Sequence, residues 1–80
     1  MTDKEILVTL QQVFDDVFIE PVEVSPALSA EEVEEWDSLT HVSLVVAVEK
    51  TFKIRFAVGE VEAAANIGDM VGLIKQHLQE

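Results

Sequence analysis

The chain contains no cysteine, and its 80 residues include only three glycines and two prolines. Without cysteine it has no disulfide framework, no thiolate metal site and no cysteine nucleophile. Its stability must come from packing, which suits a reducing compartment, so we expect a cytoplasmic protein. With 49% apolar residues the composition is that of a folded chain and not of a disordered one. We expect residues 1–80 to form a single domain, which buries only about 60% of its unfolded surface.

Basic residues are also scarce, because five Lys and Arg stand against sixteen Asp and Glu, for a formal net charge of -11. This charge disfavours nucleic acid and anionic membranes as partners, since binding phosphate requires a basic patch. A partner with a basic surface is the natural complement, and we expect a monomer. The N-terminus lacks the pattern of a signal peptide. The longest apolar run, Leu44 to Val48, is too short to cross a bilayer.

Apolar residues spaced by three and four predict an amphipathic helix near each end of the chain. The first helix starts with a capping box of Thr2 and Glu5 and is stopped by Pro21, because proline disfavours helical geometry in the residue before it. The last helix is capped by Asn66 and has Lys75 in its final turn, where positive charge is favourable. The core residues of the two helices are Ile6, Leu7, Leu10, Val13, Phe14, Val17 and Phe18, and Ile67, Met70, Val71, Ile74 and Leu78.

A central helix is predicted over residues 38–52, which contain neither glycine nor proline. Its β-branched residues also fit a buried strand on propensity alone, but the segment has no period-two alternation. Asp37 or Ser38 is a good N-cap, and an acid at that end suits the helix dipole.

The segment before this helix, residues 20–37, is predicted to be a long extended connection. Ser29 and Glu32 are placed to cap a single helical turn within it. A connection this long in a compact domain is usually either functional or a sign that its elements are wrongly assigned. Here it delivers the chain to Ser38, and we therefore expect it to serve that residue.

After the central helix, Val58, Val61 and Ala64 predict a short helix whose stability is limited by Gly59. The expected fold is all-α, a small four-helix bundle of three main helices plus one short helix around a single core.

The central helix carries two apolar stripes. The stripe with core spacing consists of Leu44, Val45, Val48 and Phe52, and the second consists of Leu39, Val42, Val46 and Glu49. Because a small bundle rarely buries a helix on both sides, part of the second stripe is expected to stay exposed beside Ser38 as a docking surface. The pattern is equally compatible with Val42 and Val46 merely widening the core face.

The sequence Asp37-Ser38-Leu39 at the head of an apolar helix, in a small acidic chain, resembles the phosphopantetheine attachment site of acyl and peptidyl carrier proteins. The likeness in spacing runs from Trp36 to Leu78. It implies that a phosphopantetheinyl transferase moves 4′-phosphopantetheine from coenzyme A to Ser38. It also implies that Asp37 lies beside the metal and base chemistry of that transferase. The thiol of the arm would then carry acyl or aminoacyl groups as thioesters.

The same resemblance implies a docking face for acyl-loading and acyl-processing enzymes that have basic patches. Its residues are Leu39, Val42, Ser43, Val46, Glu49 and Lys50. Ser43 and Lys50 stand where carriers of fatty-acid synthesis commonly have acids. Together with Trp36, these departures favour a dedicated biosynthetic pathway over general fatty-acid elongation. The alternative is an interaction module that keeps the carrier fold but is never modified.

A catalytic triad of Ser38, His41 and Asp37 is the alternative in which the chain is an enzyme. A triad needs the histidine aimed at the serine and oriented by a buried acid, whereas an acid at a helix start generally caps the helix. No oxyanion hole or sizeable pocket is recognisable. We therefore expect no enzymatic activity, with His41 at the surface or in a partner contact and His77 at a helix end.

A metal site is the other alternative, because five carboxylates fall within seven residues. They are Glu31, Glu32, Glu34, Glu35 and Asp37. Their spacing does not match a calcium loop. We expect a solvated acidic face and no bound metal.

Overall fold

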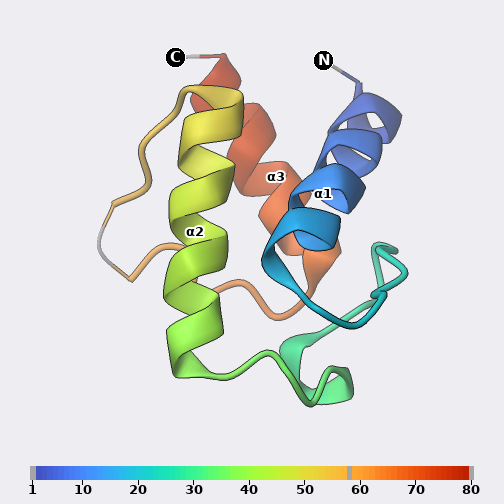
Figure 1. The fold of residues 1–80 in the computed structure, drawn as a ribbon. Helices are drawn as coiled ribbons and strands as arrows, with labels where there is room; N and C mark the ends of the chain where they lie inside the picture. The colour runs from blue at the N-terminus through green and yellow to red at the C-terminus, as the bar shows by residue number, and fades with distance from the viewer. Residues whose placement is uncertain (1, 58, 80) are drawn as a thin grey trace.

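The computed structural model describes residues 2–57 and 59–79. Within those ranges the chain forms three α-helices and no strand, so the predicted all-α class is confirmed. The helices are α1 (Asp3–Val17), α2 (Ser38–Phe52) and α3 (Ile67–Leu78), and a single 3-10 turn, η1 (Ala30–Glu32), lies between α1 and α2. α1 runs opposite to α2 and α3, so both termini lie at one end of the molecule and the start of α2 lies at the other (Figure 1).

The capping box predicted at the start of α1 is present. The backbone N–H of Glu5 donates to Thr2 Oγ1 over 3.2 Å, and the N–H of Thr2 donates to the Glu5 carboxylate over 2.8 Å. The helix ends at Val17, with Phe18 in extended geometry as its C-cap. Pro21 is therefore not what stops it. The helix already ends three residues before the residue that the proline restricts, Glu20.

One continuous core holds the three helices together, and α1 packs against both α2 and α3. Its fully or nearly buried residues are Ile6, Leu10, Val13, Phe14, Phe18, Leu44, Val48, Phe52, Val61, Ile67, Met70, Val71 and Ile74. Burying one such side chain contributes roughly 1.5–3 kcal/mol. No polar or charged residue is buried among the described ones, so packing alone stabilises this interior.

The connection from α1 to α2 is long but pinned to the helices. The side-chain amide of Gln11 donates to the carbonyl of Val22 over 2.7 Å and accepts from the N–H of Val24 over 2.9 Å. The turn η1 is held by Glu32, whose carboxylate accepts from the backbone N–H and the hydroxyl of Ser29. The predicted single turn is thus confirmed.

The predicted short helix after α2 is wrong. Residues 59–63 form consecutive turns, and Val58 lies outside the described residues. Gly59 has a φ of 82°, in the left-handed region, which interrupts helical geometry at the start of the segment. Val61 is nevertheless buried, so it belongs to the core without lying in a helix.

No helix among the described residues is both long enough and apolar enough to cross a membrane.

Candidate functional site

Ser38 is the first residue of α2 and its side chain is exposed. Asp37 before it is the N-cap, with extended backbone geometry, and its carboxylate accepts from the backbone N–H of Thr40 over 2.9 Å. This hydrogen bond to the charged form holds the pKa of Asp37 below its usual value. Of the two N-cap candidates, Asp37 is the one used. The serine is thereby left at the helix start with its hydroxyl free of any capping role.

Trp36 anchors the chain immediately before this helix start. Its ring meets Phe14 edge to face at 5.4 Å and Phe18 at 5.9 Å between centroids. Phe14 and Phe18 also stack on each other at 5.1 Å, which makes one aromatic cluster with Trp36. Such pairs are the favoured geometry for aromatic rings. The packing of Trp36 on the core therefore fixes the chain two residues before Ser38.

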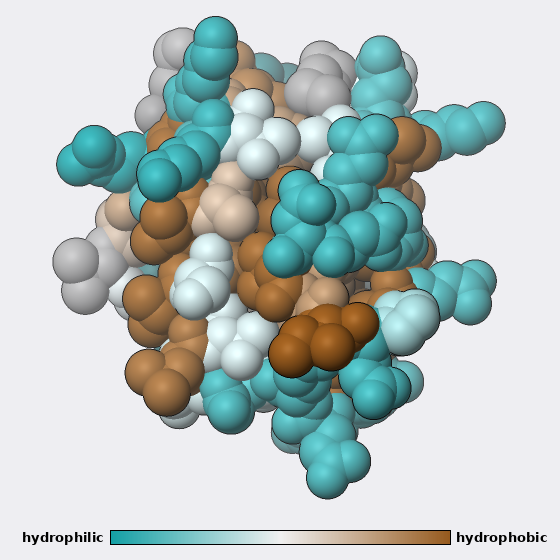
Figure 2. Space-filling model, viewed as in Figure 1, coloured by the Kyte–Doolittle hydropathy of each residue, from teal (hydrophilic) through white to brown (hydrophobic). Residues whose placement is uncertain are grey.

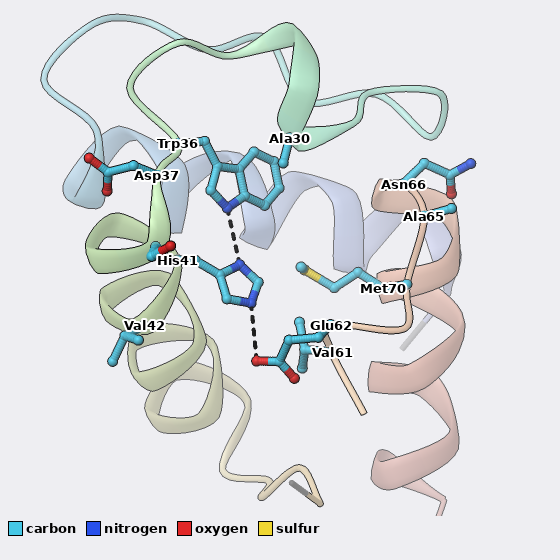
Figure 3. Close-up of a pocket in the computed structure, with 12 residues that line it drawn as sticks. Ala30, Trp36, Asp37, His41, Val42, Val61, Glu62, Ala65, Asn66 and Met70 are labelled. Carbon is cyan, nitrogen blue, oxygen red and sulfur yellow. Dashed lines mark hydrogen bonds and ion pairs between the residues drawn. The ribbon is translucent and has the colours of Figure 1, made fainter. Parts of the chain in front are cut away.

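His41 lies against Trp36, between that ring and Glu62 (Figure 3). The indole N–H donates to His41 Nδ1 over 3.1 Å, so in the neutral ring the proton sits on Nε2. Nε2 is buried and is 3.5 Å from the Glu62 carboxylate, too far for a good hydrogen bond. His41 was expected at the surface or in a partner contact. It is half-buried, with 22% of its side chain exposed, because Trp36 packs over it, and the partner contact stays a prediction.

The same geometry rules out the catalytic triad. Nδ1 of His41 is occupied by the indole of Trp36 and Nε2 faces Glu62, so neither nitrogen is aimed at the hydroxyl of Ser38. The Asp37 carboxylate is used as a helix cap and does not orient the histidine. This arrangement supplies no activated nucleophile.

A cleft of about 640 Å³ opens beside Ser38, between α2, the start of α3 and the connection that joins them. It is called the serine cleft below. Figure 3 shows Met70 pointing into it from α3 and His41 from α2. Its other lining residues are Ala30, Trp36, Asp37, Ser38, Val42, Val61, Glu62, Ala64, Ala65 and Asn66. The sequence alone did not indicate this cleft, because its lining residues come from segments that are distant along the chain and meet only in the folded protein.

The connection between α2 and α3 forms one wall of this cleft. His77 of α3 holds this connection in place, because its Nε2 is 2.6 Å from the carboxylate of Glu60 in the connection. This contact, with a further hydrogen bond from the N–H of Ala57, holds the pKa of Glu60 below its usual value. His77 lies at a helix end as expected, and its contact with Glu60 also ties the connection to α3.

The second apolar stripe of α2 is exposed. Leu39, Val42 and Val46, the docking strip, keep 81%, 60% and 43% of their surface accessible. Figure 2 shows hydrophobic surface along α2, at the left of the view. On the opposite side Leu44, Val48 and Phe52 are buried, and Val45 is half-buried. The alternative that Val42 and Val46 only widen the core is therefore excluded.

Comparison with known proteins decides the family. No family model matches the chain, and a search of curated proteins finds no match. Among solved structures, the chain is similar to the solution NMR structure of the holo acyl carrier protein from Geobacter metallireducens. The two are 35% identical, with a TM-score of 0.75, over 98% of this chain and 86% of that one. The chain belongs to the acyl carrier protein family. It is a carrier and not an enzyme.

The remaining residues expected to dock partners on this acyl carrier protein differ in how free they are. Ser43 and Lys50 are exposed. Glu49 is half-buried, and its carboxylate accepts from the backbone N–H of Phe56 over 2.8 Å. Its carbonyl accepts from the N–H of Ile54, which closes the end of α2. Glu49 thus has a structural role that helical spacing alone did not indicate.

The acidic run before α2 is more than a solvated face. Glu35 is half-buried, and its carboxylate accepts from the backbone N–H groups of Ile19 at 2.8 Å and Glu20 at 3.1 Å. Glu32 and Asp37 cap η1 and α2. No group of three metal-ligating side chains converges among residues 2–57 and 59–79. Three acids of this run, Glu32, Glu35 and Asp37, thus bind backbone N–H groups.

Proposed function

We propose that Ser38 is the attachment point of a 4′-phosphopantetheine arm and that the arm carries acyl or aminoacyl groups as thioesters. The observation that carries this proposal is the exposed serine at the first position of α2, beside an exposed apolar strip, in a chain similar to a holo acyl carrier protein. The alternative is a carrier-fold interaction module that is never modified.

The site suits a phosphate ester. Ser38 lies at the N-terminus of α2, where free backbone N–H groups and the helix dipole favour negative charge. Because nothing in the chain activates the Ser38 hydroxyl, the reaction needs another enzyme. A phosphopantetheinyl transferase would supply the base that takes the hydroxyl proton. The serine oxygen would bond to phosphorus as the pyrophosphate bond of coenzyme A breaks and adenosine bisphosphate leaves.

Partner enzymes would bind α2. The docking strip supplies an apolar centre, and Asp37 is exposed at its end, where the transferase could read the carboxylate. Positive patches on acyl-loading and acyl-processing enzymes complement a carrier of net charge -11. The serine cleft offers room beside the arm for part of the arm or of the cargo.

We further propose that the pathway is a dedicated one and not general fatty-acid elongation. Ser43 and Lys50 are both exposed on α2, so the missing acid at one position and the reversed charge at the other are available to a partner. Charges at the edge of an interface tune encounter rate and specificity more than affinity.

The test of the arm is a mass measurement. The protein is incubated with coenzyme A and a transferase of broad specificity and is then weighed intact. We expect a gain of one phosphopantetheine, and we expect the gain to be lost in Ser38→Ala. Ser43→Ala is the matched control, since Ser43 is exposed on the same helix and should not affect the gain. Modification that persists in Ser38→Ala, or no gain in the unmutated chain, contradicts the proposal, and the latter favours the unmodified module.

A further inference from the structure

A second apolar groove lies in the connection between α1 and α2. It encloses about 800 Å³ and shares no lining residue with the serine cleft or the docking strip. Its apolar lining consists of Ile19, Pro21, Val22, Leu28 and Val33. Ile19 is 92% exposed, more than any residue of the docking strip. Figure 2 shows a strongly hydrophobic patch below the end of α1, with hydrophilic side chains to its right and below it. This feature is called the loop groove.

The backbone around the loop groove is fixed before any partner arrives. Both oxygens of the Glu35 carboxylate are used, one by the N–H of Ile19 and the other by that of Glu20, so one wall is tied to the other. Gln11 of α1 also holds the backbone of Val22, which lines the groove, and of Val24, two residues further on. A preformed groove binds more tightly than a flexible loop, because less ordering is needed on binding.

The rim of the loop groove carries charge of one sign. The acids that line it are Glu20, Glu23, Glu32, Glu34 and Glu35. The sequence has no Lys or Arg between Lys4 and Lys50. None of the ion pairs between described residues involves these acids. The rim is therefore left to attract a cation from outside the chain, an interaction that salt screens.

We propose that the loop groove binds a short segment of another protein in which one large aliphatic side chain is flanked by Lys or Arg. The aliphatic group would pack against Ile19 and the floor of the groove, and the flanking cations would meet Glu20 and Glu23 on the rim. A second copy of this chain does not fit, because the net charge of -11 makes two copies repel each other. An anionic lipid surface is excluded by the same sign of charge. The surface lies apart from Ser38 and does not require that residue to be modified.

The test uses isotope-labelled Ser38→Ala protein, so that its result is independent of the arm. The probe is a synthetic peptide of alternating lysine and leucine, titrated in while backbone amide signals are followed by NMR. We expect the largest shifts at Ile19, Glu20 and Glu34, and weaker binding as salt rises. Matched peptides with serine for leucine, or with glutamate for lysine, should not bind the groove.

Variants of the protein sharpen the assignment. Ile19→Ser should weaken binding at least about fivefold, the scale expected for losing a buried aliphatic contact. It should leave the fold intact, because Ile19 is almost fully exposed. Val8→Ser is the matched control, an exposed apolar residue of α1 outside the groove, and should keep full affinity. The double variant Glu20→Gln, Glu23→Gln should make the affinity for the peptide less dependent on salt.

Three results would each overturn the assignment. The first is amide shifts confined to Leu39, Val42 and Val46. The second is an Ile19→Ser protein that binds the peptide as tightly as the protein with Ile19. The third is a serine-for-leucine peptide that binds as tightly as the lysine–leucine peptide. The last would mean that the acids attract cations without any contribution from the groove.

Discussion

Replacing Trp36 with alanine should destabilise the fold by about 3 kcal/mol and loosen the start of α2. Trp36 makes two edge contacts, with Phe14 and Phe18, and such pairs contribute about 0.5–1.5 kcal/mol each. Its indole N–H bonds to His41, and a hydrogen bond of this kind contributes about 1 kcal/mol. The indole borders the serine cleft, so its removal enlarges an open space and leaves no sealed cavity.

That loss is large for a chain of this size. A domain of 80 residues is typically stable by about 4–12 kcal/mol. The variant should therefore still fold, with a melting temperature lower by roughly 12–24 °C. Urea unfolding followed by far-ultraviolet circular dichroism measures the change, because tryptophan fluorescence is lost with the side chain. Amide exchange at Thr40 and His41, in the first turn of α2, should accelerate more than exchange at Val48.

A milder variant separates the ring from its N–H group. Trp36→Phe keeps an aromatic ring against Phe14 and Phe18 but cannot donate to His41, and should cost about 1 kcal/mol for that bond. In a His41→Leu background the same change should cost about that much less, since the bond is already gone. A loss below about 1 kcal/mol for Trp36→Ala, or no coupling between Trp36 and His41, would refute the anchoring role.

Three further predictions concern charge. Added salt or magnesium should raise the melting temperature. The chain has a net charge of -11, and salt screens the repulsion between its acidic groups, with a Debye length of about 10 Å at 0.1 M. A melting temperature that does not change with salt would count against this. The hydrogen bonds that lower the pKa of Glu5, Asp37 and Glu60 contribute stability that is complete above pH 4.5 and lost as pH falls through their lowered values; acid titration of Glu5→Gln should show a shallower loss than the unmutated chain. The Ser43→Glu, Lys50→Glu double variant, in its holo form, should be acylated faster by one ketoacyl synthase or malonyl transferase, most clearly at low salt; equal rates across a salt series would remove the main support for a dedicated pathway.

The sequence was sufficient for α2 and its surface. The bounds Ser38–Phe52 match the prediction, although valines favour strands, because the Asp37 cap and the absence of glycine and proline act locally. The exposure of Val42 and Val46 follows from the same periodicity, since a helix can bury only one side in so small a bundle.

What the sequence did not indicate depends on contacts between distant segments. His41 is drawn inward by Trp36 and Glu62, one before the helix and one in the following connection. The short helix expected around Val61 fails because burying that side chain requires no helix, and Gly59 takes a left-handed φ. The role of Glu35 was hidden for the same reason, because its two donors lie fifteen and sixteen residues earlier in the chain.

A partner that binds Oδ1 of the Asp37 carboxylate competes with the N–H of Thr40, which donates to that oxygen, whereas a partner that binds Oδ2 leaves this hydrogen bond in place. Breaking that bond removes the N-cap, so the first turn of α2 becomes free to fray at the residue that follows, Ser38. By thermodynamic linkage, binding of a partner to Oδ1 and unwinding of this turn then favour each other. The oxygen that an enzyme binds would thus decide whether Ser38 stays in the first turn of α2 or is released from it when the enzyme docks.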